Sequence, residues 1–344
     1  MKALIAMSGG VDSAAAAFLA QQAGFECIGC TMRLFDGAGD DAADAAKIAE
    51  ALHMPHYVFD FTADFREKVI GKFIGCYFCG KTPNPCIDCN RHFKFAALLR
   101  EADRLGCERI VTGHYARCVQ TAEGYRLLRG TDPAKDQSYV LHMLTQAQLA
   151  RVFFPLGELT KQQVRQIAAE QGFVNAQKRE SQDICFVPDG DYARVIGAYS
   201  GRTSELGDFV DLHGNVLGRH RGIIHYTVGQ RRGLGIALGA PAYVVGIDAA
   251  ENRVILGTND DLFTDTVRIT GCNWIAGAPP KEPVRCTAKI RYRHPAQPAW
   301  LTFTDPENAV LRFDVPQRAV TAGQSAVWYD GDAVLGGGEI VNAE

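Results

Sequence analysis

The segment KALIAMSGGVDSAAAAFLAQQA, residues 2–23, decides the fold. Its apolar start, Lys2–Met7, predicts a short buried strand, and the alanine-rich stretch Asp12–Ala23 predicts a helix that ends at Gly24. A turn with two glycines separates them. Because a strand, a tight turn and a helix in this order are typical of α/β domains, we expect the chain to open with a parallel sheet.

The same alternation continues to about residue 198. Short apolar runs predict further strands, and helical periodicity with acidic first turns predicts further helices. The expected strands are Phe25–Thr31, His56–Asp60 and Arg109–Thr112, and the expected helices are Asp40–His53, Asp64–Ile74 and one through Arg104 that follows a cysteine- and proline-rich loop, Gly75–Cys89. We therefore predict one α/β domain, residues 1–198, with helices on both faces of its sheet.

Helical patterns disappear after residue 198, where short alternating segments are separated by glycine, asparagine and aspartate. Examples are DLHGNVLG, APAYVVGIDAAENRVILG and VWYDGDAVLGGG. This composition is typical of all-β structure. An aspartate-rich break at Thr258–Asp265 divides the region into two small β-rich domains, 199–264 and 265–344, although periodicity does not distinguish barrels from open sheets.

Composition limits the classes of protein to which the chain can belong. At 344 residues, with 47% hydrophobic and 22% charged residues, it can bury several cores and lacks the composition of a disordered chain. No stretch is apolar for long enough to span a bilayer and the start does not resemble a signal peptide, so we expect a cytoplasmic protein with no membrane partner. The formal net charge of -3 means that a nucleic-acid site must be a local patch, and most of the eleven cysteines are expected to be reduced.

The turn Ser8–Ser13, SGGVDS, is a candidate phosphate-binding loop. Its glycines let backbone amides approach a phosphate at the start of the helix, and Ser8 and Ser13 add hydroxyl donors. Asp12 is a candidate ligand for Mg²⁺ on the departing pyrophosphate. The alternative is an ordinary glycine turn in which Asp12 or Ser13 caps the helix.

The SGGVDS string after an N-terminal strand resembles the pyrophosphatase loop of enzymes that cleave ATP to AMP and pyrophosphate while adenylating a substrate. This resemblance implies an adenine-nucleotide-hydrolase-like first domain that binds ATP with Mg²⁺. A methionine after the second strand would by default belong to the core. The residues that the resemblance places at ATP are Ala6, Met7, Ser8, Gly9, Gly10, Val11, Asp12, Ser13, Met32 and Gly113.

A second phosphate pattern, GCYFCGKT at Gly75–Thr82, matches the kinase-type loop G-x-x-x-x-G-K-[ST] by spacing alone. Such a loop needs a strand before it and a helix after it. Here a helix is expected before it, and Pro83 and Pro85 are expected to prevent a helix from starting there. We therefore expect no phosphate site at this second pattern.

Two cysteines stand out by the sequence around them, Cys89 in TPNPCIDCNRHFKF and Cys185 in RESQDICFV. Both strings resemble signatures of the tRNA 2-thiouridylase family, N-P-x-x-x-C-N-x-x-x-K-F and S-Q-D-I-C-F. The resemblance implies that Cys185 carries sulfur as a persulfide and that Cys89 attacks it, which leaves a Cys89–Cys185 disulfide to be reduced. The alternative for a free cysteine is a small buried hydrophobe, and we adopt it for Cys27, Cys30, Cys107, Cys118, Cys272 and Cys286.

The implied chemistry has a physical reason. A uridine carbonyl is a poor electrophile, so adenylation of its oxygen supplies a leaving group, and AMP departs with that oxygen when sulfur attacks. The sulfur nucleophile must be a thiolate or a persulfide, which nearby cations and amides stabilise. Arg91, Lys94 and Arg179 are the candidate cations.

Cys76, Cys79, Cys86 and Cys89 form a C-x2-C-x6-C-x2-C array that looks like a paired metal site. The gap of six residues is shorter than that of a zinc ribbon, and the family resemblance already assigns Cys89 to catalysis. Many members of the family have an aspartate where Cys86 stands. This departure leaves open a [4Fe-4S] cluster on Cys86, Cys89 and Cys185, which an iron-free anaerobic preparation would exclude.

The resemblance also implies contacts with tRNA, including a segment around a target base that must be flipped out of its stack to be reached. The alternatives are solvated loops, a helix cap and a surface histidine at a strand end. Basic runs in the β region, GRHRG, GQRRG and RYRH, offer the local positive patch that the net charge does not. The expected tRNA-contacting residues are Asn84, Pro85, Cys86, His114, Lys135, Asp136, Gln137, Arg291, Tyr292 and Gln324.

The resemblance spans nearly the whole chain, up to GQSAV near its end, and implies that the last domain is a β-barrel. It implies ATP-dependent 2-thiolation of the wobble uridine in tRNAs for lysine, glutamate and glutamine, with sulfur from a cysteine desulfurase or a sulfur carrier protein. Two other functions share the ATP loop. An adenylating amide ligase or amidotransferase would not need Cys89 or Cys185, and a tRNA-binding or metal-storing protein with an inactive ATP site would form no AMP.

Overall fold

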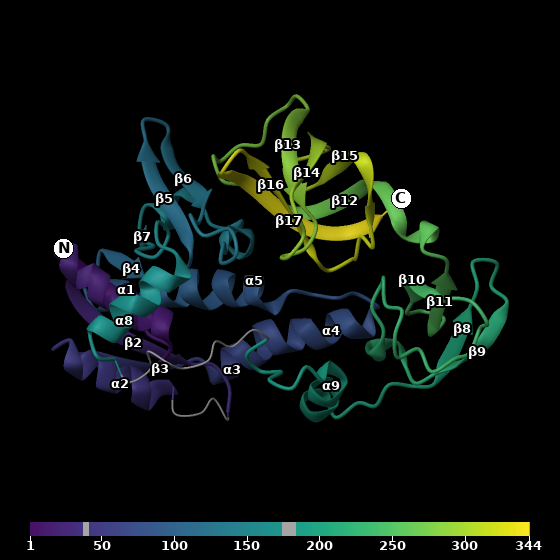
Figure 1. Cartoon of the computed structure of the whole chain (residues 1–344), viewed down its shortest axis with the longest axis horizontal. Helices are drawn as coiled ribbons and strands as arrows, with labels where there is room; N and C mark the ends of the chain where they lie inside the picture. Colours follow the sequence, from purple (N-terminus) through teal and green to yellow (C-terminus); the bar gives the residue numbers. More distant parts are fainter. Residues whose placement is uncertain (37–40, 174–183, 344) are drawn as a thin grey trace.

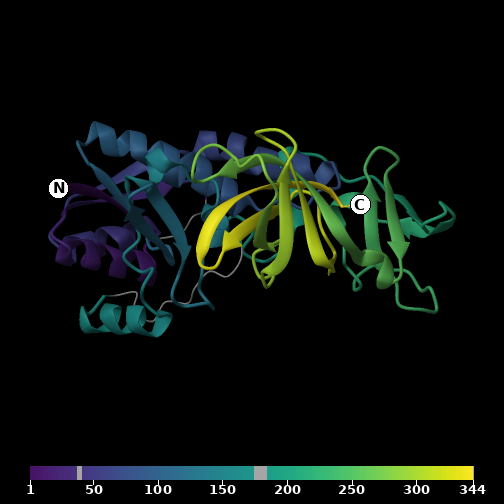
Figure 2. The ribbon, with the colours of Figure 1, turned by 90° about the horizontal axis from the view of Figure 1, so that it is seen from above.

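The computed structural model describes residues 1–36, 41–173 and 184–343. The α/β domain lies at one end of an elongated molecule and a small β-sheet domain at the other (Figure 1), with a β-barrel between them (Figure 2). Among the described residues, no helix combines the length and apolar character needed to cross a membrane.

The first domain is built on a parallel sheet, as predicted, to which β7 adds a fifth strand that the sequence did not indicate. Its order is β3-β2-β1-β4-β7. The strands are β1 (Lys2–Ala6), β2 (Glu26–Arg33), β3 (His56–Asp60), β4 (Arg109–Val111) and β7 (Val152–Phe153). Since β1 is central, its side chains are buried on both faces, which explains its continuous apolar run.

Helices cover both faces of this sheet. Ala3 and Ile5 pack with α1 (Val11–Gln22), α2 (Asp41–Ala51) and α8 (Lys161–Glu170), whereas Leu4 points to the opposite face and packs with α6 (Leu98–Arg104). This alternation along β1 is the two-residue period of a strand. The fold prediction is confirmed for this domain, although Asp40, the expected start of the second helix, lies outside the described residues.

Two helical segments run beneath the barrel (Figure 1). The first comprises α3 (Thr62–Phe65), η1 (Arg66–Gly71) and α4 (Lys72–Phe78), and the second comprises α5 (Pro85–Cys89) and η2 (Asn90–Ala97), which continues into α6. The expectation that Pro85 prevents a helix start was wrong, because proline is tolerated at the first helical position, where its missing N–H is not needed. The helix α4 extends through Gly75–Phe78, so the loop expected from Gly75 begins later, and the GCYFCGKT pattern lacks the preceding strand of a kinase-type loop.

Two further helices are α7 (Gln146–Leu149) and α9 (Tyr192–Ser200). After α9 the chain is β-rich, as predicted. A four-stranded sheet in the order β10-β11-β8-β9 precedes a closed six-stranded barrel in the order β12-β15-β14-β13-β16-β17, in which β12 also pairs with β17. The bounds of these strands are β8 (Gly207–Val210), β9 (Val216–His220), β10 (Tyr243–Asp248), β11 (Arg253–Gly257), β12 (Phe263–Trp274), β13 (Val284–Lys289), β14 (Gln297–Phe303), β15 (Ala309–Arg318), β16 (Ser325–Asp330) and β17 (Ala333–Ala343); short 3-10 turns lie at Ser138–Leu141 (η3), Ile223–His225 (η4) and Asp260–Leu262 (η5).

The barrel is joined to the first domain more closely than the sequence predicts. The hairpin β5 (Ala116–Thr121) and β6 (Gly124–Arg129) belongs to the first half of the chain, yet β6 pairs with β17 and extends the barrel sheet. Val327, Tyr329 and Val334 of the barrel share one hydrophobic cluster with Leu4 of β1. The α/β domain and the barrel are therefore held together by a common core.

Candidate active site

The SGGVDS turn lies between β1 and α1, at the carboxyl end of the parallel sheet. Gly9 has a φ of +68°, which favours glycine. The buried hydroxyl of Ser13 accepts a hydrogen bond from the Ser8 N–H (3.2 Å) and donates one to the Gly10 carbonyl (2.9 Å). Contrary to the alternative interpretation, no side chain among the described residues caps α1, so the first amides of this helix fit an anionic ligand such as a phosphate.

Asp12 is held in a polar cluster at this helix start. Its carboxylate accepts hydrogen bonds from Lys161 Nζ (2.7 and 2.9 Å) and from the Tyr115 hydroxyl (2.7 Å). Lys161 is the first residue of α8, which Thr160 caps, and only 12% of its side chain is exposed. Sequence reasoning missed Lys161 because the contact depends on the packing of α8 on α1; its local signal is the T-K-Q-Q capping box.

Gly113 brings the end of β4 against the phosphate loop. A Cβ added at Gly113 would lie 2.9 Å from the backbone carbon of Asp12, so only glycine allows this approach. Met7 donates its N–H to the Cys30 carbonyl (2.8 Å), while its own carbonyl accepts from Thr31 Oγ1 (2.9 Å). Met32 is half-buried near the end of β2, where it packs against two hydrophobic clusters, one with Leu4 and one with Phe65.

Three thiols form the second part of the site. Cys86 and Cys89 lie on α5, and Cys185 comes from a loop almost 100 residues later, yet each is close enough to the other two for their charges to interact. Lys94, one helical turn after Cys89, acts on all three. Lys94 is thus the candidate cation that lies near the thiols. Arg179 and the first three residues of S-Q-D-I-C-F lie outside the described residues.

The thiols are held in their protonated form. Burial raises the pKa of Cys89 to about 12, although Lys94 opposes this shift. Burial and the neighbouring Cys86 raise the pKa of Cys185 to about 11, and Lys94 again opposes the shift. All three are free thiols in this structure. A thiolate therefore forms here only when the local environment changes or a more acidic sulfur species, such as a persulfide, is present.

The same thiols do not form a metal cage as they are placed. Among the described residues, no three histidine, cysteine or acidic side chains are gathered closely enough to hold a metal ion. The cluster hypothesis for Cys86, Cys89 and Cys185 finds no support in this arrangement. Of the six cysteines assigned to packing, Cys27, Cys30, Cys107 and Cys286 are buried and Cys118 and Cys272 are half-buried.

His114 connects the two parts of the site. It follows Gly113, its Nδ1 lies 2.7 Å from Thr112 Oγ1, and its ring packs between Phe95 and Phe154. Burial, and then Lys94, hold its pKa well below the usual histidine value. Only 5% of the residue is exposed, so the alternative interpretation as a surface histidine was wrong, and the predicted contact with tRNA would require exposure of the ring.

The other residues expected to contact tRNA divide into two groups. Asn84 caps α5 by accepting the Cys86 N–H (3.2 Å), and Pro85 follows at the first helical position. Asp136 accepts from the Gly130 and Ser138 amides (3.1 and 3.0 Å). Together with Gln137, which accepts the Tyr115 N–H (3.0 Å), and the adjacent Lys135, this second group fixes the loop before η3.

Side chains of the barrel domain contact the loop before η3 and the segment just before Asn84. Tyr292 is 36% exposed, donates its hydroxyl to the Asp136 carbonyl (3.2 Å) and interacts electrostatically with Cys86. Gln324 Nε2 donates to the Thr82 carbonyl (2.7 Å), two residues before Asn84. Arg291 is half-buried and donates to the Arg318 carbonyl at 3.5 Å. Residues far apart in sequence therefore surround the thiols.

An open parallel sheet with an uncapped glycine turn at its carboxyl edge defines a nucleotide-binding α/β protein. Family comparison agrees: residues 1–189 match the "tRNA methyl transferase HUP domain", residues 194–258 the "tRNA methyl transferase PRC-barrel domain" and residues 264–340 the "Aminomethyltransferase beta-barrel domain".

Curated relatives define the family more closely. The "tRNA-specific 2-thiouridylase MnmA" of Acidithiobacillus ferrooxidans (strain ATCC 53993 / BNL-5-31) is 48% identical over 100% of this chain and 99% of its own. That of Syntrophotalea carbinolica is 49% identical over 98% of this chain and 97% of its own. The chain belongs to the tRNA-specific 2-thiouridylase family. Among solved structures, the NMN synthetase of Francisella tularensis covers 59% of this chain and 79% of its own at 18% identity, with a TM-score of 0.36.

Proposed function

We propose that this protein catalyses the ATP-dependent 2-thiolation of a tRNA uridine. One observation carries the proposal: Lys94 acts electrostatically on the three thiols and also on His114, whose neighbour Gly113 packs on the phosphate loop. The loop and the thiols therefore serve one reaction centre. The names of the relatives point to the same reaction, whereas an amide ligase with this loop would have no use for the thiols.

The first step is adenylation of the uridine O2. The uncapped start of α1, with the hydroxyls of Ser8 and Ser13, would bind the ATP phosphates. Asp12 would hold Mg²⁺, which screens the negative charge of the phosphates when bound, while Lys161 is released from Asp12 to reach the departing pyrophosphate. Gly113 and Met32 would contact the adenosine from the ends of β4 and β2.

The second step transfers sulfur. A Cys185 persulfide is attacked at its inner sulfur by the Cys89 thiolate, so that a Cys89–Cys185 disulfide forms and hydrosulfide leaves. The hydrosulfide adds to C2 of the adenylated uridine, and AMP departs with the former O2. A two-electron thiol reductant then restores both thiols. The persulfide sulfur is supplied by a donor protein such as a cysteine desulfurase or a sulfur carrier.

The tRNA would lie across all three domains, which we assign to residues 1–198, 199–264 and 265–344. Asn84, Pro85 and Cys86 would surround the flipped base, while Lys135, Asp136, Gln137, Arg291, Tyr292 and Gln324 would contact the flanking nucleotides. We propose the wobble uridine of lysine, glutamate and glutamine tRNAs as the target, in the cytoplasm.

A reconstituted assay tests the proposal. The protein is mixed with Mg-ATP, unmodified lysine tRNA and a sulfide source, and nucleotides and tRNA digests are quantified. The expected products are AMP, pyrophosphate and 2-thiouridine in equal amounts. If AMP appears but no 2-thiouridine forms, even when a persulfide donor is supplied, the proposal is wrong.

A further inference from the structure

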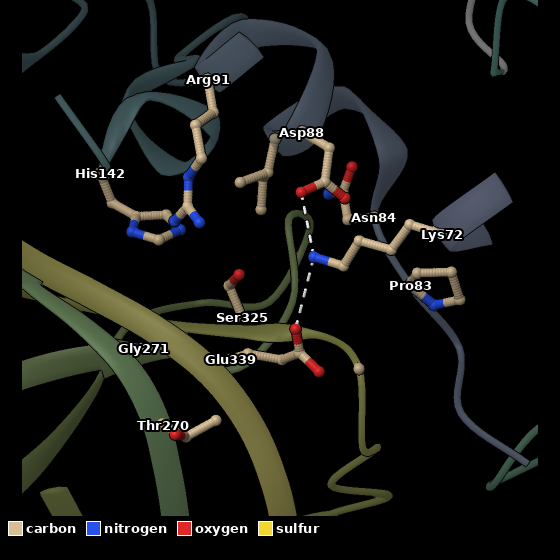
Figure 3. Close-up of a pocket in the computed structure, with 12 residues that line it drawn as sticks. Lys72, Pro83, Asn84, Asp88, Arg91, His142, Thr270, Gly271, Ser325 and Glu339 are labelled. Atoms are coloured by element: carbon tan, nitrogen blue, oxygen red, sulfur yellow. Dashed lines mark hydrogen bonds and ion pairs between the residues drawn. The ribbon is translucent and has the colours of Figure 1, made fainter. Parts of the chain in front are cut away.

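The pocket between α5 and the barrel has features that the proposed chemistry does not use (Figure 3). Lys72, Asp88 and Arg91 line it from the helices, Glu339 lines it from β17, and His142 lies at one end beside Arg91. We call it the α5–barrel pocket. Pro83 and Asn84 also line it, so it adjoins the segment proposed to surround the target base.

His142 is a buried polar side chain whose ring has no hydrogen-bond partner in the part of the chain that the structure describes. Only 1% of the residue is exposed, and neither ring nitrogen has a hydrogen bond among the described residues. Asn273 Nδ2 donates to the His142 carbonyl (2.8 Å), and a Cβ added at Gly337 would lie 2.5 Å from His142 Nδ1. The ring is thus fixed in place although its unpaired polar atoms destabilise the free protein, which is a common property of binding sites.

The described charged side chains in and beside the pocket differ in whether they form ion pairs. Lys72 Nζ is 3.0 Å from Asp88 Oδ1 and 3.5 Å from Glu339 Oε2, and Lys81 Nζ is 3.5 Å from Glu339 Oε1. These two lysines neutralise the two acids. Arg91 is exposed and makes no ion pair within the part of the chain that the structure describes. Burial, and then the charge of Arg91, lower the pKa of His142 to about 3, so the ring is neutral and offers one N–H donor.

We propose that the α5–barrel pocket binds a backbone phosphate of the tRNA substrate, through the guanidinium of Arg91 and a ring N–H of His142. This inference rests on the proposed function. A guanidinium presents paired donors that match phosphate oxygens, and a rigid ring N–H adds a third donor. Phosphate contacts fix the register of a nucleic acid without reading its sequence. A phosphate held beside Asn84 would therefore position the neighbouring nucleotide for flipping toward the thiols.

The test compares tRNA affinity across a salt series for the wild type, Arg91→Gln, Arg91→Lys and Arg100→Gln, an exposed arginine on α6 outside the pocket. We expect Arg91→Gln to weaken binding about tenfold at low salt and to reduce the slope of log K against log salt by about 0.7 to 0.9, the value of one lost phosphate contact. Arg91→Lys keeps the charge and should retain the slope. Arg100→Gln should have neither effect.

His142→Leu provides an independent readout. It replaces the unpaired ring nitrogens with an apolar side chain that can still fill the site. The melting temperature should therefore stay the same or rise, while tRNA affinity falls several-fold. The phosphate site is refuted if Arg91→Gln has the same tRNA affinity and salt slope as Arg100→Gln and if His142→Leu binds tRNA with normal affinity. The proposed function stands in that case as long as the wild type thiolates tRNA. A wild type that neither binds nor thiolates tRNA overturns both.

Discussion

The phosphate loop and the thiol centre are built in opposite ways. The loop consists of consecutive residues whose polar groups are already engaged, as in the Ser13 bonds to Ser8 and Gly10 and the Lys161 pair with Asp12. The thiol centre brings Cys89 on α5 together with Cys185, almost 100 residues away, and desolvation raises the pKa of both thiols although the Cys185 residue is exposed. The loop is therefore already shaped for its ligand, whereas the raised pKa values leave little thiolate at neutral pH.

This difference suggests a division of labour. The phosphate loop already has its backbone shape and needs little change beyond the release of Lys161 from Asp12, whereas protonated thiols react slowly with oxidants and other electrophiles. Reaction at the thiols must then await both a persulfide and an activated base. Changes to the thiols should abolish product without affecting nucleotide binding, and changes to the loop should slow the first step.

The largest effect is expected for Cys185→Ser. A serine hydroxyl cannot carry a persulfide, so 2-thiouridine should fall below detection while ATP and tRNA still bind with nearly wild-type affinity. Mass spectrometry of tRNA digests measures the product, and Cys118→Ser, a half-buried cysteine outside the centre, is the control. Normal thiolation by Cys185→Ser would remove the persulfide role.

A smaller effect is expected for Lys161→Met. Loss of the cation that pairs with Asp12 should slow AMP formation by about 100-fold, the typical result of removing one group that stabilises developing charge. Initial rates of AMP release measure it, and Lys47→Met, on the exposed face of α2, provides a matched control. An unchanged rate would show that Lys161 serves only the packing of α8.

The thiol pKa values predict how alkylation depends on pH. Because the pKa of Cys89 is raised to about 12, its thiolate fraction grows throughout the range from neutral pH to 10 and reaches no plateau there. Lys94 favours the thiolate, so Lys94→Gln should raise the pKa further and slow alkylation of Cys89 by about three- to tenfold at a given pH. Iodoacetamide labelling of the Cys89 peptide measures this rate. A plateau below pH 9 would contradict the buried, protonated thiol.

The smallest effect is expected for Gln324→Ala. Loss of its hydrogen bond to the Thr82 carbonyl should lower the free energy of unfolding by about 1 kcal/mol. Urea denaturation measures this change, with Gln166→Ala on the exposed face of α8 as the control. A several-fold loss of tRNA affinity with unchanged stability would instead assign Gln324 to direct RNA contact.

The sequence predicted the sheet, the loop and the β-rich second half because each rests on local patterns. Neighbouring residues in the sequence are enough to predict the buried strand at Lys2–Met7, the turn with two glycines and the alternating β segments. Contacts between elements that are distant in the sequence could not be predicted in this way. The pairing of β6 with β17, the Lys161 contact with Asp12 and the burial of His114 between Phe95 and Phe154 depend on tertiary packing.

The most direct test of the central claim, that one centre activates the uridine oxygen and replaces it with sulfur, follows that oxygen. A lysine tRNA carrying ¹⁸O at O2 of the wobble uridine is thiolated with Mg-ATP and a persulfide donor, and AMP and pyrophosphate are analysed by mass spectrometry. The account predicts one ¹⁸O atom in AMP for each 2-thiouridine formed and none in pyrophosphate. Thiolated tRNA accompanied by unlabelled AMP would contradict it.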